Sequence, residues 1–191
     1  MKKLLLLLAT VATIFTACEG GLDNEENGVS VKPNQILYTS SDNKIVTPDE
    51  SDVFGANIVS NTYENGQGVI TFDAPVTSIG MYAFGLCTSL TSVTIGDSVT
   101  EIGFGAFWDC DSLTSVTIPD SVTSIGEDAF YECSSLTSVY CKATTPPTGD
   151  WDMFDYNASG RKIYVPRNSV SAYKSAEYWS KYASDIVGYD F

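Results

Sequence analysis

The sequence predicts an α/β repeat solenoid: a short, right-handed stack of coils, each built from short strands and a helical turn. Three observations lead to this prediction. The string SIGEDAFYECSSLTSV at 124–139 recurs in similar form at 101–116 and 78–93, shifted by 23 residues each time. LTSVTI alternates apolar and hydroxyl residues as a half-buried strand does. Gly and PDS turn the chain between such runs, and a repeat of this length indicates coils that bury their apolar faces against one another.

The apolar residues of the repeat occupy equivalent positions in each coil. These positions are held by Ile79, Ile102 and Ile125; by Ala83-Phe84, Ala106-Phe107 and Ala129-Phe130; by Cys87, Cys110 and Cys133; by Leu90, Leu113 and Leu136; and by Val93, Val116 and Val139. VTSIG predicts a second short strand in each coil. At about 100° per residue, the spacing of Ala, Phe and Cys places all three on one side of a short helical turn.

A fourth, degenerate coil is predicted after the three clear ones. Phe154 and Ile163 keep the nine-residue spacing that separates Phe from Val in the other coils. Asn157 stands at the cysteine position and Gly160 at the leucine position, while TTPPTGDWD replaces the second strand. This coil is therefore expected to carry an irregular loop.

Both ends of an open solenoid need caps, because they would otherwise leave sheet edges and apolar faces in water. We expect an N-terminal β cap over 35–75, the coils over 76–166 and a C-terminal cap over 167–191. Asn65-Gly66 predicts the turn of a β-hairpin in the first cap. The second cap is predicted to be helical after a capping Asn168 or Ser169, because apolar residues recur there every three or four positions: Val170, Tyr173, Ala176, Trp179, Ala183 and Ile186.

The first 17 residues are typical of a signal peptide, with Lys2 and Lys3 before an apolar run that is too short to span a bilayer. Thr16, Ala17 and Cys18 resemble the lipobox of bacterial lipoproteins, which implies lipidation of Cys18 and an anchor in the outer membrane. Phe15 departs from that pattern and leaves ordinary cleavage open. Residues 18–34 follow as an acidic, Gly-rich tether, and an acidic run after a lipidated cysteine resembles a surface-export signal.

The pattern SLTSVTIPDSVTSIGEDAFYEC resembles the 23-residue leucine-rich repeats of the BspA-like family. ILYTSSDNKIVTP and the stretch from residue 164 to the end resemble the terminal caps of its lipoprotein members, so the resemblance covers nearly all of the chain after Cys18. It implies a leucine-rich-repeat solenoid on the cell surface that acts in host adhesion or protein binding. The small number of coils departs from the longer arrays of adhesins.

Charge and composition exclude several classes of function. Without Lys2 and Lys3 the chain has eight basic and 24 acidic residues, a net charge of −16, which argues against nucleic-acid binding and against membrane contact other than through the lipid anchor. The absence of histidine removes Ser-His-Asp and Cys-His nucleophile pairs and the usual zinc sites. Asp109, Asp128 and Glu132 could form carboxylate pairs for glycoside cleavage, but we interpret them as a solvated acidic face, with Asp128 and Glu132 pointing into water. No cofactor, metal or catalytic residue is predicted.

Four cysteines remain after Cys18, and two interpretations of them stay open. Cys87, Cys110 and Cys133 occupy an inward position, and Cys141 stands where Ile118 stands one coil earlier, so buried free thiols are expected. Stacked coils also bring equivalent Cα atoms to about strand spacing, which allows a strained disulfide.

Aromatic side chains are the predicted binding residues, because solenoids present side chains in rows and binding hot spots favour Trp and Tyr. The candidates are Phe104, Trp108, Tyr131, Trp151 and Tyr156, on one flank of the helical turns and in the GDWDMFDY loop. They could instead pack against the adjoining coil. The strand face opposite them is expected to present small and neutral side chains. The protein is expected to be a monomer that binds a surface protein of the host or of a bacterium. The alternative is that it is a glycan-binding accessory lipoprotein that stacks sugars on Trp108, Trp151 or Tyr156.

Overall fold

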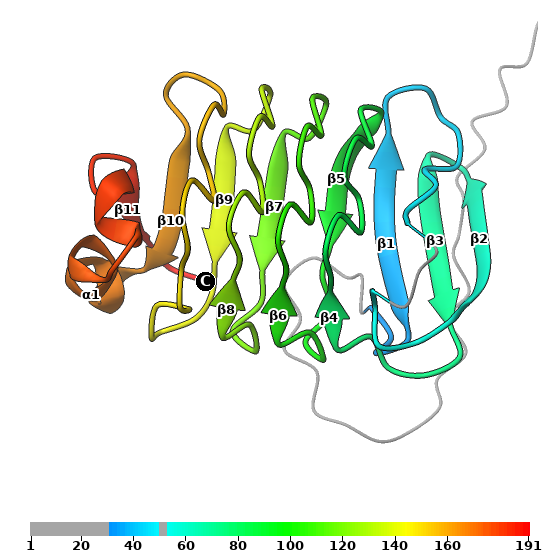
Figure 1. The fold of residues 1–191 in the computed structure, drawn as a ribbon, viewed down its shortest axis with the longest axis horizontal. Helices are drawn as coiled ribbons and strands as arrows, with labels where there is room; N and C mark the ends of the chain where they lie inside the picture. Colours follow the sequence, from blue (N-terminus) through cyan, green and yellow to red (C-terminus); the bar gives the residue numbers. More distant parts are fainter. Residues whose placement is uncertain (1–30, 50–52) are drawn as a thin grey trace, which may run out of the picture.

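The computed structural model describes residues 31–49 and 53–191. They form a stack of coils with three long sides: an eight-stranded sheet, a three-stranded parallel sheet and a series of tight turns (Figure 1). The elements are β1 (Gln35–Ser40), β2 (Ile58–Glu64), β3 (Gln67–Phe72), β4 (Ser78–Ile79), β5 (Leu90–Thr94), β6 (Glu101–Ile102), β7 (Ser115–Ile118), β8 (Ser124–Ile125), β9 (Ser138–Cys141), β10 (Lys162–Pro166), η1 (Arg167–Ser169), α1 (Val170–Ser175), η2 (Trp179–Tyr182) and β11 (Ile186–Tyr189).

The strand register confirms the equivalent positions read from the repeat. In the large sheet, with order β11-β10-β9-β7-β5-β1-β3-β2, Val116 pairs with Val93 on one side and with Val139 on the other. Val139 pairs in turn with Ile163, so the degenerate fourth coil continues the sheet. In the small sheet, β4, β6 and β8 pair in parallel, and the loop of the fourth coil adds a single bridge from Thr148 to Ser124.

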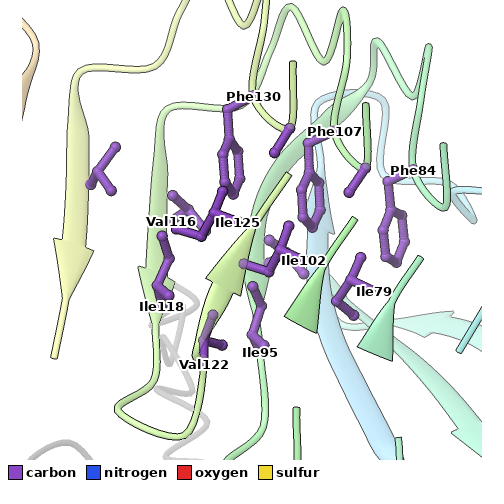
Figure 2. Packing of buried hydrophobic residues seen from close by; sticks show 14 of the residues in the cluster. Ile79, Phe84, Ile95, Ile102, Phe107, Val116, Ile118, Val122, Ile125 and Phe130 are labelled. Atoms are coloured by element: carbon purple, nitrogen blue, oxygen red, sulfur yellow. The ribbon is translucent and has the colours of Figure 1, made fainter. Parts of the chain in front are cut away.

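A column of phenylalanine rings runs through the core along the axis of the stack. Phe84, Phe107, Phe130 and Phe154 lie with successive ring centroids 5.2, 5.0 and 5.3 Å apart and with their planes within 10° of parallel. Figure 2 shows three of these rings above the buried isoleucines of β4, β6 and β8. Offset stacking of this kind adds to the free energy gained by burying the rings.

The predicted helical turn is wrong. Each coil instead has a run of tight turns, at 81–86, 104–109, 127–132 and 151–156, and we call these four runs the turn ladder. Alternate N–H groups in each of the first three runs donate to carbonyl oxygens of the next coil, as Phe84 does to Ala106 at 2.8 Å and Phe107 to Ala129 at 2.7 Å. A helix would use these donors within its own coil.

Left-handed backbone at two positions in every run turns the donors towards the neighbouring coil. The residues are Tyr82 and Leu86, Gly105 and Asp109, Asp128 and Glu132, and Asp152 and Tyr156, all with φ between 52° and 62°. Such a conformation costs a non-glycine residue about 1–2 kcal/mol. The hydrogen bonds between coils offset this cost, since they satisfy main-chain groups that would otherwise be buried without a partner.

The inward cysteines are hydrogen-bond donors as well as core residues. Cys110 Sγ donates to the carbonyl oxygen of Phe84 at 3.1 Å, and Cys133 Sγ donates to that of Phe107 at 3.0 Å. In the fourth coil the Asn157 amide takes over this contact and donates to Phe130 at 2.7 Å. Cys87, Cys110, Cys133 and Cys141 are all free thiols, so the disulfide alternative does not hold in this structure.

The N-terminal end of the stack is covered by antiparallel strands. β1 pairs with β5 on one side and β3 on the other, and β2 forms a hairpin with β3 through Asn65 and Gly66. Both turn residues have positive φ, 51° and 83°, as a two-residue hairpin turn requires. The main-chain N–H of Asp49 donates to the carbonyl oxygen of Ala83. This hydrogen bond terminates the turn ladder at this end.

The C-terminal end differs from the predicted helix. The helix α1 has only six residues, left-handed Tyr178 interrupts the chain, and Ile186 lies in β11, which pairs in parallel with β10. Ser169 does not cap the helix with its side chain; its hydroxyl donates to the Thr144 carbonyl. A strand here pairs with the main-chain N–H and C=O groups along the edge of β10, which a helix could not do. Trp179 is still buried in the core.

We expect Cys133→Ala to lower the free energy of unfolding by about 0.5–1.5 kcal/mol, because it removes the Sγ donor to the buried Phe107 carbonyl, which then keeps only the 3.3 Å hydrogen bond from the Cys110 N–H. Cys87→Ala is the matched control, since Cys87 is only half-buried and its contact with the Thr47 carbonyl is long, at 3.6 Å. Urea unfolding with equal m values measures both. Equal losses in the two variants would contradict a structural role of the thiol hydrogen bond.

Candidate functional site

The outward side chains of the turn ladder form one surface, which we call the turn face. Five large apolar side chains on it are substantially exposed: Met81 (59%), Tyr82 (39%), Leu86 (59%), Trp151 (62%) and Tyr156 (69%). The turn face is thus the part of the described chain where most of the exposed large apolar residues gather. Met81, Tyr82 and Leu86 lie in the first run of the turn ladder, and Trp151 and Tyr156 lie in the last. Exposed apolar side chains that cluster in this way mark a binding site more often than single exposed residues do.

Two of the predicted binding residues gather around a tyrosine that the sequence analysis did not select. Phe104 and Trp108 are half-buried, and their rings lie 5.2 and 6.0 Å from that of Tyr82 in edge-to-face contact. Tyr82 in turn covers Gly105, where an added Cβ would lie 2.5 Å from the tyrosine ring. Glycine at this position therefore makes room for the ring of the preceding coil.

The other three predicted residues lie in two further clusters near the last coil. Tyr131 is half-buried against Tyr156, with the ring centroids 5.0 Å apart and the planes at 68°. Trp151 lies 5.4 Å from Tyr178, at 71°. Packing against the adjoining coil, the alternative interpretation, thus describes Tyr131 as well as Phe104 and Trp108. Trp151 and Tyr156 keep most of their surface in water.

Sequence reasoning could have found two of the missed residues. Tyr82 and Leu86 lie two positions before and after Phe84, the positions expected to point away from the core. Tyr178 carried no such signal, because it falls outside the apolar spacing of the C-terminal segment and takes a left-handed conformation there.

Carboxylates surround these rings. Glu132 is exposed as expected, but Asp109 and Asp128 are half-buried, so the prediction that Asp128 lies in water is only partly correct. Burial raises the pKa of Asp128, and the neighbouring charges of Glu127, Asp152, Asp155 and Glu132 raise it further. The acidic positions thus repel one another along the turn ladder.

The sequence predicts small and neutral side chains on the outer face of the large sheet. The structure instead has an aromatic cluster there. Tyr140 and Tyr164 stack in parallel with centroids 4.7 Å apart, and Tyr189 contacts both rings edge-on. Phe191 lies beside Tyr189, at 5.1 Å. Tyr164 stands opposite Tyr140 in the strand register, at a position that Thr117 holds in β7, so the repeat alignment could have indicated this second aromatic cluster.

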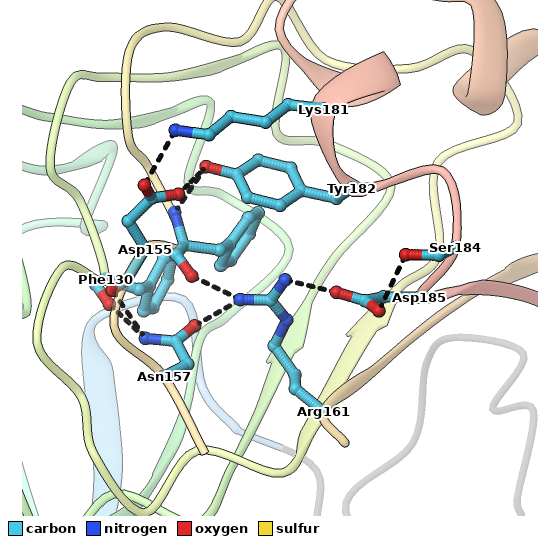
Figure 3. Close-up of polar contacts among 9 residues, drawn as sticks. Phe130, Asp155, Asn157, Arg161, Lys181, Tyr182, Ser184 and Asp185 are labelled. Carbon is cyan, nitrogen blue, oxygen red and sulfur yellow. Dashed lines mark hydrogen bonds and ion pairs between the residues drawn. The ribbon is translucent and has the colours of Figure 1, made fainter. Parts of the chain in front are cut away.

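A shallow cavity of about 370 Å³, largely open to solvent, lies beside the last run of the turn ladder. Arg161 and Asp185 form an ion pair at its wall, with Nη2 2.6 Å from Oδ2, and Arg161 Nη1 donates to the Phe154 carbonyl and to Asn157 (Figure 3). Tyr182 donates to Asp155 at 2.9 Å, and Lys181 lies 2.7 Å from the same carboxylate. Both carboxylates of this cavity are therefore already bound to cationic side chains.

The described residues contain no cluster of three or more metal-ligating side chains. Among those same residues, no helix has the length and apolar character needed to cross a membrane. Cys18, the predicted lipidation site, the signal peptide and most of the tether lie outside the described ranges.

Comparison with known proteins identifies the repeat. A family model described as the BspA type leucine rich repeat region matches residues 41–181 with six copies. The chain belongs to this family. The matched range extends beyond the four coils into both ends of this BspA-type protein. A search of curated proteins finds no match.

One solved structure that resembles this BspA-type chain is that of a leucine rich cell surface protein from Faecalibacterium prausnitzii A2-165. The two sequences are 25% identical, and the match covers 76% of this chain and 45% of the other, with a TM-score of 0.37. The matched part of that protein is thus less than half of its length.

We expect Asp128→Asn to stabilise the protein at neutral pH by less than about 1 kcal/mol, because it removes a repelled charge near the surface. Since the pKa of Asp128 is raised in the folded state, the folded protein binds more protons there, and stability rises as pH falls through that pKa. The gain should therefore vanish at about pH 3, where the carboxyl is protonated in both states. Unfolding of both proteins at the two pH values measures this, with Asp97→Asn on the loop after β5 as control; a gain that persists at low pH would contradict the charge explanation.

Proposed function

We propose that this protein is a non-enzymatic cell-surface module that binds another protein through its turn face. The observation that carries the proposal is the arrangement of the exposed aromatic rings, which meet edge to face in separate clusters and are interspersed with carboxylates. Large aromatic side chains in a mixed apolar and polar surround are typical of protein interfaces. Membership of a leucine-rich-repeat family supports the same function.

The geometry is less suited to the alternative, a glycan-binding lipoprotein. A sugar ring stacks on an exposed, flat aromatic face, and two neighbouring coplanar rings would provide a platform for a chain of sugars. The planes of the ring pairs on the turn face lie between 64° and 85° to each other. The rings of Tyr140 and Tyr164 are nearly parallel, but they stack on each other, so each covers one face of the other.

The remaining parts of the proposal rest on the sequence. Cys18 carries the lipid anchor in the outer membrane, and the acidic tether that follows it holds the repeat domain outside the cell. The partner is a surface protein of the host or of another bacterium, and the module binds it as a monomer.

We expect the double variant Trp151→Ala, Tyr156→Ala to bind the target protein at least about tenfold more weakly, because hot-spot residues of this kind contribute 2 kcal/mol or more. The target comes from a panel of extracellular-matrix proteins and polysaccharides, tested at physiological salt with competition by unlabelled protein. Tyr164→Ala, an equivalent truncation on the outer sheet face, is the control.

Saturable binding of a matrix protein that is lost in the double variant and kept in Tyr164→Ala supports the proposal. The reverse pattern would move the binding site to the outer sheet face and contradict it. Saturable binding of a polysaccharide with no protein bound would favour the glycan alternative.

A further inference from the structure

The last run of the turn ladder has main-chain donors with no further coil to receive them. In the three preceding runs the second left-handed residue donates its N–H to the next coil: Leu86 to Trp108 at 2.8 Å, Asp109 to Tyr131 at 2.9 Å and Glu132 to Asp155 at 3.0 Å. Tyr156 holds this position in the last run. Its N–H has no acceptor among the residues that the structure describes.

The C-terminal segment provides an acceptor only for the middle N–H donor of this run. The Phe154 N–H donates to the hydroxyl of Tyr182 at 3.2 Å, in the place where a next coil would offer a carbonyl. Tyr156 is left beside the cavity of about 370 Å³, whose lining also includes Ala158, Arg161 and Lys181. An open cavity thus occupies the place where a fifth coil would supply the missing acceptor.

Two N–H groups of residues that line this cavity have no acceptor among the described residues, the main-chain N–H of Tyr156 and the Nε of Arg161. Arg161 is only 7% exposed, and its Nε is the one buried side-chain nitrogen or oxygen of the described residues without a hydrogen-bond partner. The side-chain carboxylates of the wall are already engaged: Asp155 accepts from Tyr182 and Lys181, and Asp185 accepts from Arg161. A ligand that fits this wall therefore brings an acceptor for the free N–H and has no donor of its own to satisfy. A sugar hydroxyl is less suitable, because its own proton also needs an acceptor.

The charges of the wall select among acceptors. The carboxylates of Asp155 and Asp185 balance the cations of Arg161 and Lys181, so the cavity has no net positive charge with which to attract a carboxylate or phosphate. The acceptor that suits a neutral wall with unpaired N–H donors is an amide carbonyl, the group that receives the equivalent donor in every other coil.

We propose that this cavity binds an extended peptide segment of the partner, whose amide carbonyl accepts a hydrogen bond from the Tyr156 N–H and so continues the turn ladder by one step. The exposed ring of Tyr156 would contact the side chains of that segment. This inference rests on the proposed protein-binding function and assigns its partner a peptide main chain as the recognised group.

The test is an NMR titration of isotopically labelled protein with acetyl-Ala-Ala-Ala-amide, read at the backbone amide of Tyr156. The expected result is a saturable downfield shift of the Tyr156 amide proton, while the amides of Leu86, Asp109 and Glu132, already paired within the turn ladder, do not move. Acetate and glucose, which carry the anionic and hydroxyl chemistries, should produce no saturable shift. This comparison needs no variant and does not depend on the natural partner.

Two tryptophan substitutions localise the effect. Ala158→Trp fills the cavity and should abolish the shift, whereas Ser159→Trp, on an exposed neighbour that does not line the cavity, should leave it unchanged. An unmoved Tyr156 amide, a stronger response to acetate or glucose, or a shift that survives Ala158→Trp would overturn the proposal. Trp108→Ala separates the peptide site from the proposed protein-binding function of the turn face. It truncates the turn face away from the cavity and should leave the peptide titration unchanged.

Discussion

Hydrogen bonds that run from each coil to the next, on all three sides of the stack, are the constraint on which the rest of this structure depends. The two sheets provide them in the usual way, but the third side requires left-handed backbone at two positions in every coil. Once these bonds fix the register, identical side chains must stack on one another. The column of phenylalanines and the carbonyl contacts of Cys110, Cys133 and Asn157 follow from that register.

The same constraint explains how each end of the stack is finished. A donor from Asp49 closes the middle of the turn ladder at one end, and the hydroxyl of Tyr182 closes it at the other. The sheet ends differently: a hairpin lies before the first coil, and β11 extends the parallel strands after the last. The terminal segments thus act by replacing individual main-chain partners, and they leave gaps, such as that beside Tyr156, where no replacement is present.

Much of the fold was predictable because strands leave a clear pattern in a sequence. Alternation located the strands, and the nine-residue spacing of Phe154 and Ile163 revealed the fourth coil despite its lost cysteine and leucine. The turn ladder was not predictable in the same way, since its left-handed positions hold residues as different as Tyr82, Asp128 and Gly105. Glycine signals that conformation clearly and aspartate only weakly, while tyrosine gives no signal of it. Apolar spacing alone also could not distinguish a helix from the broken C-terminal segment that ends in β11.

The candidate site was predictable where it depends on one coil and unpredictable where it depends on several. Trp151 and Tyr156 could be selected from their residue type and position in the repeat. The cavity could not, because Arg161 meets Asp185 from 24 residues away and Tyr182 reaches Asp155 from the far end of the chain. Ordinary surface positions in the sequence thus acquire their role only when the C-terminal segment folds back on the last coil.

The free thiols have a consequence for the conditions under which this protein folds. Cys110 and Cys133 direct their protons to carbonyl oxygens in the core. Burial raises the pKa of Cys141 to about 11, so the Cys141 thiolate needed for oxidation or exchange is scarce at neutral pH. Because the sulfurs of Cys110 and Cys133 act as hydrogen-bond donors, the repeat must fold while its cysteines are reduced. Burial then protects these thiols, because oxidants and other thiols cannot reach them in the folded chain.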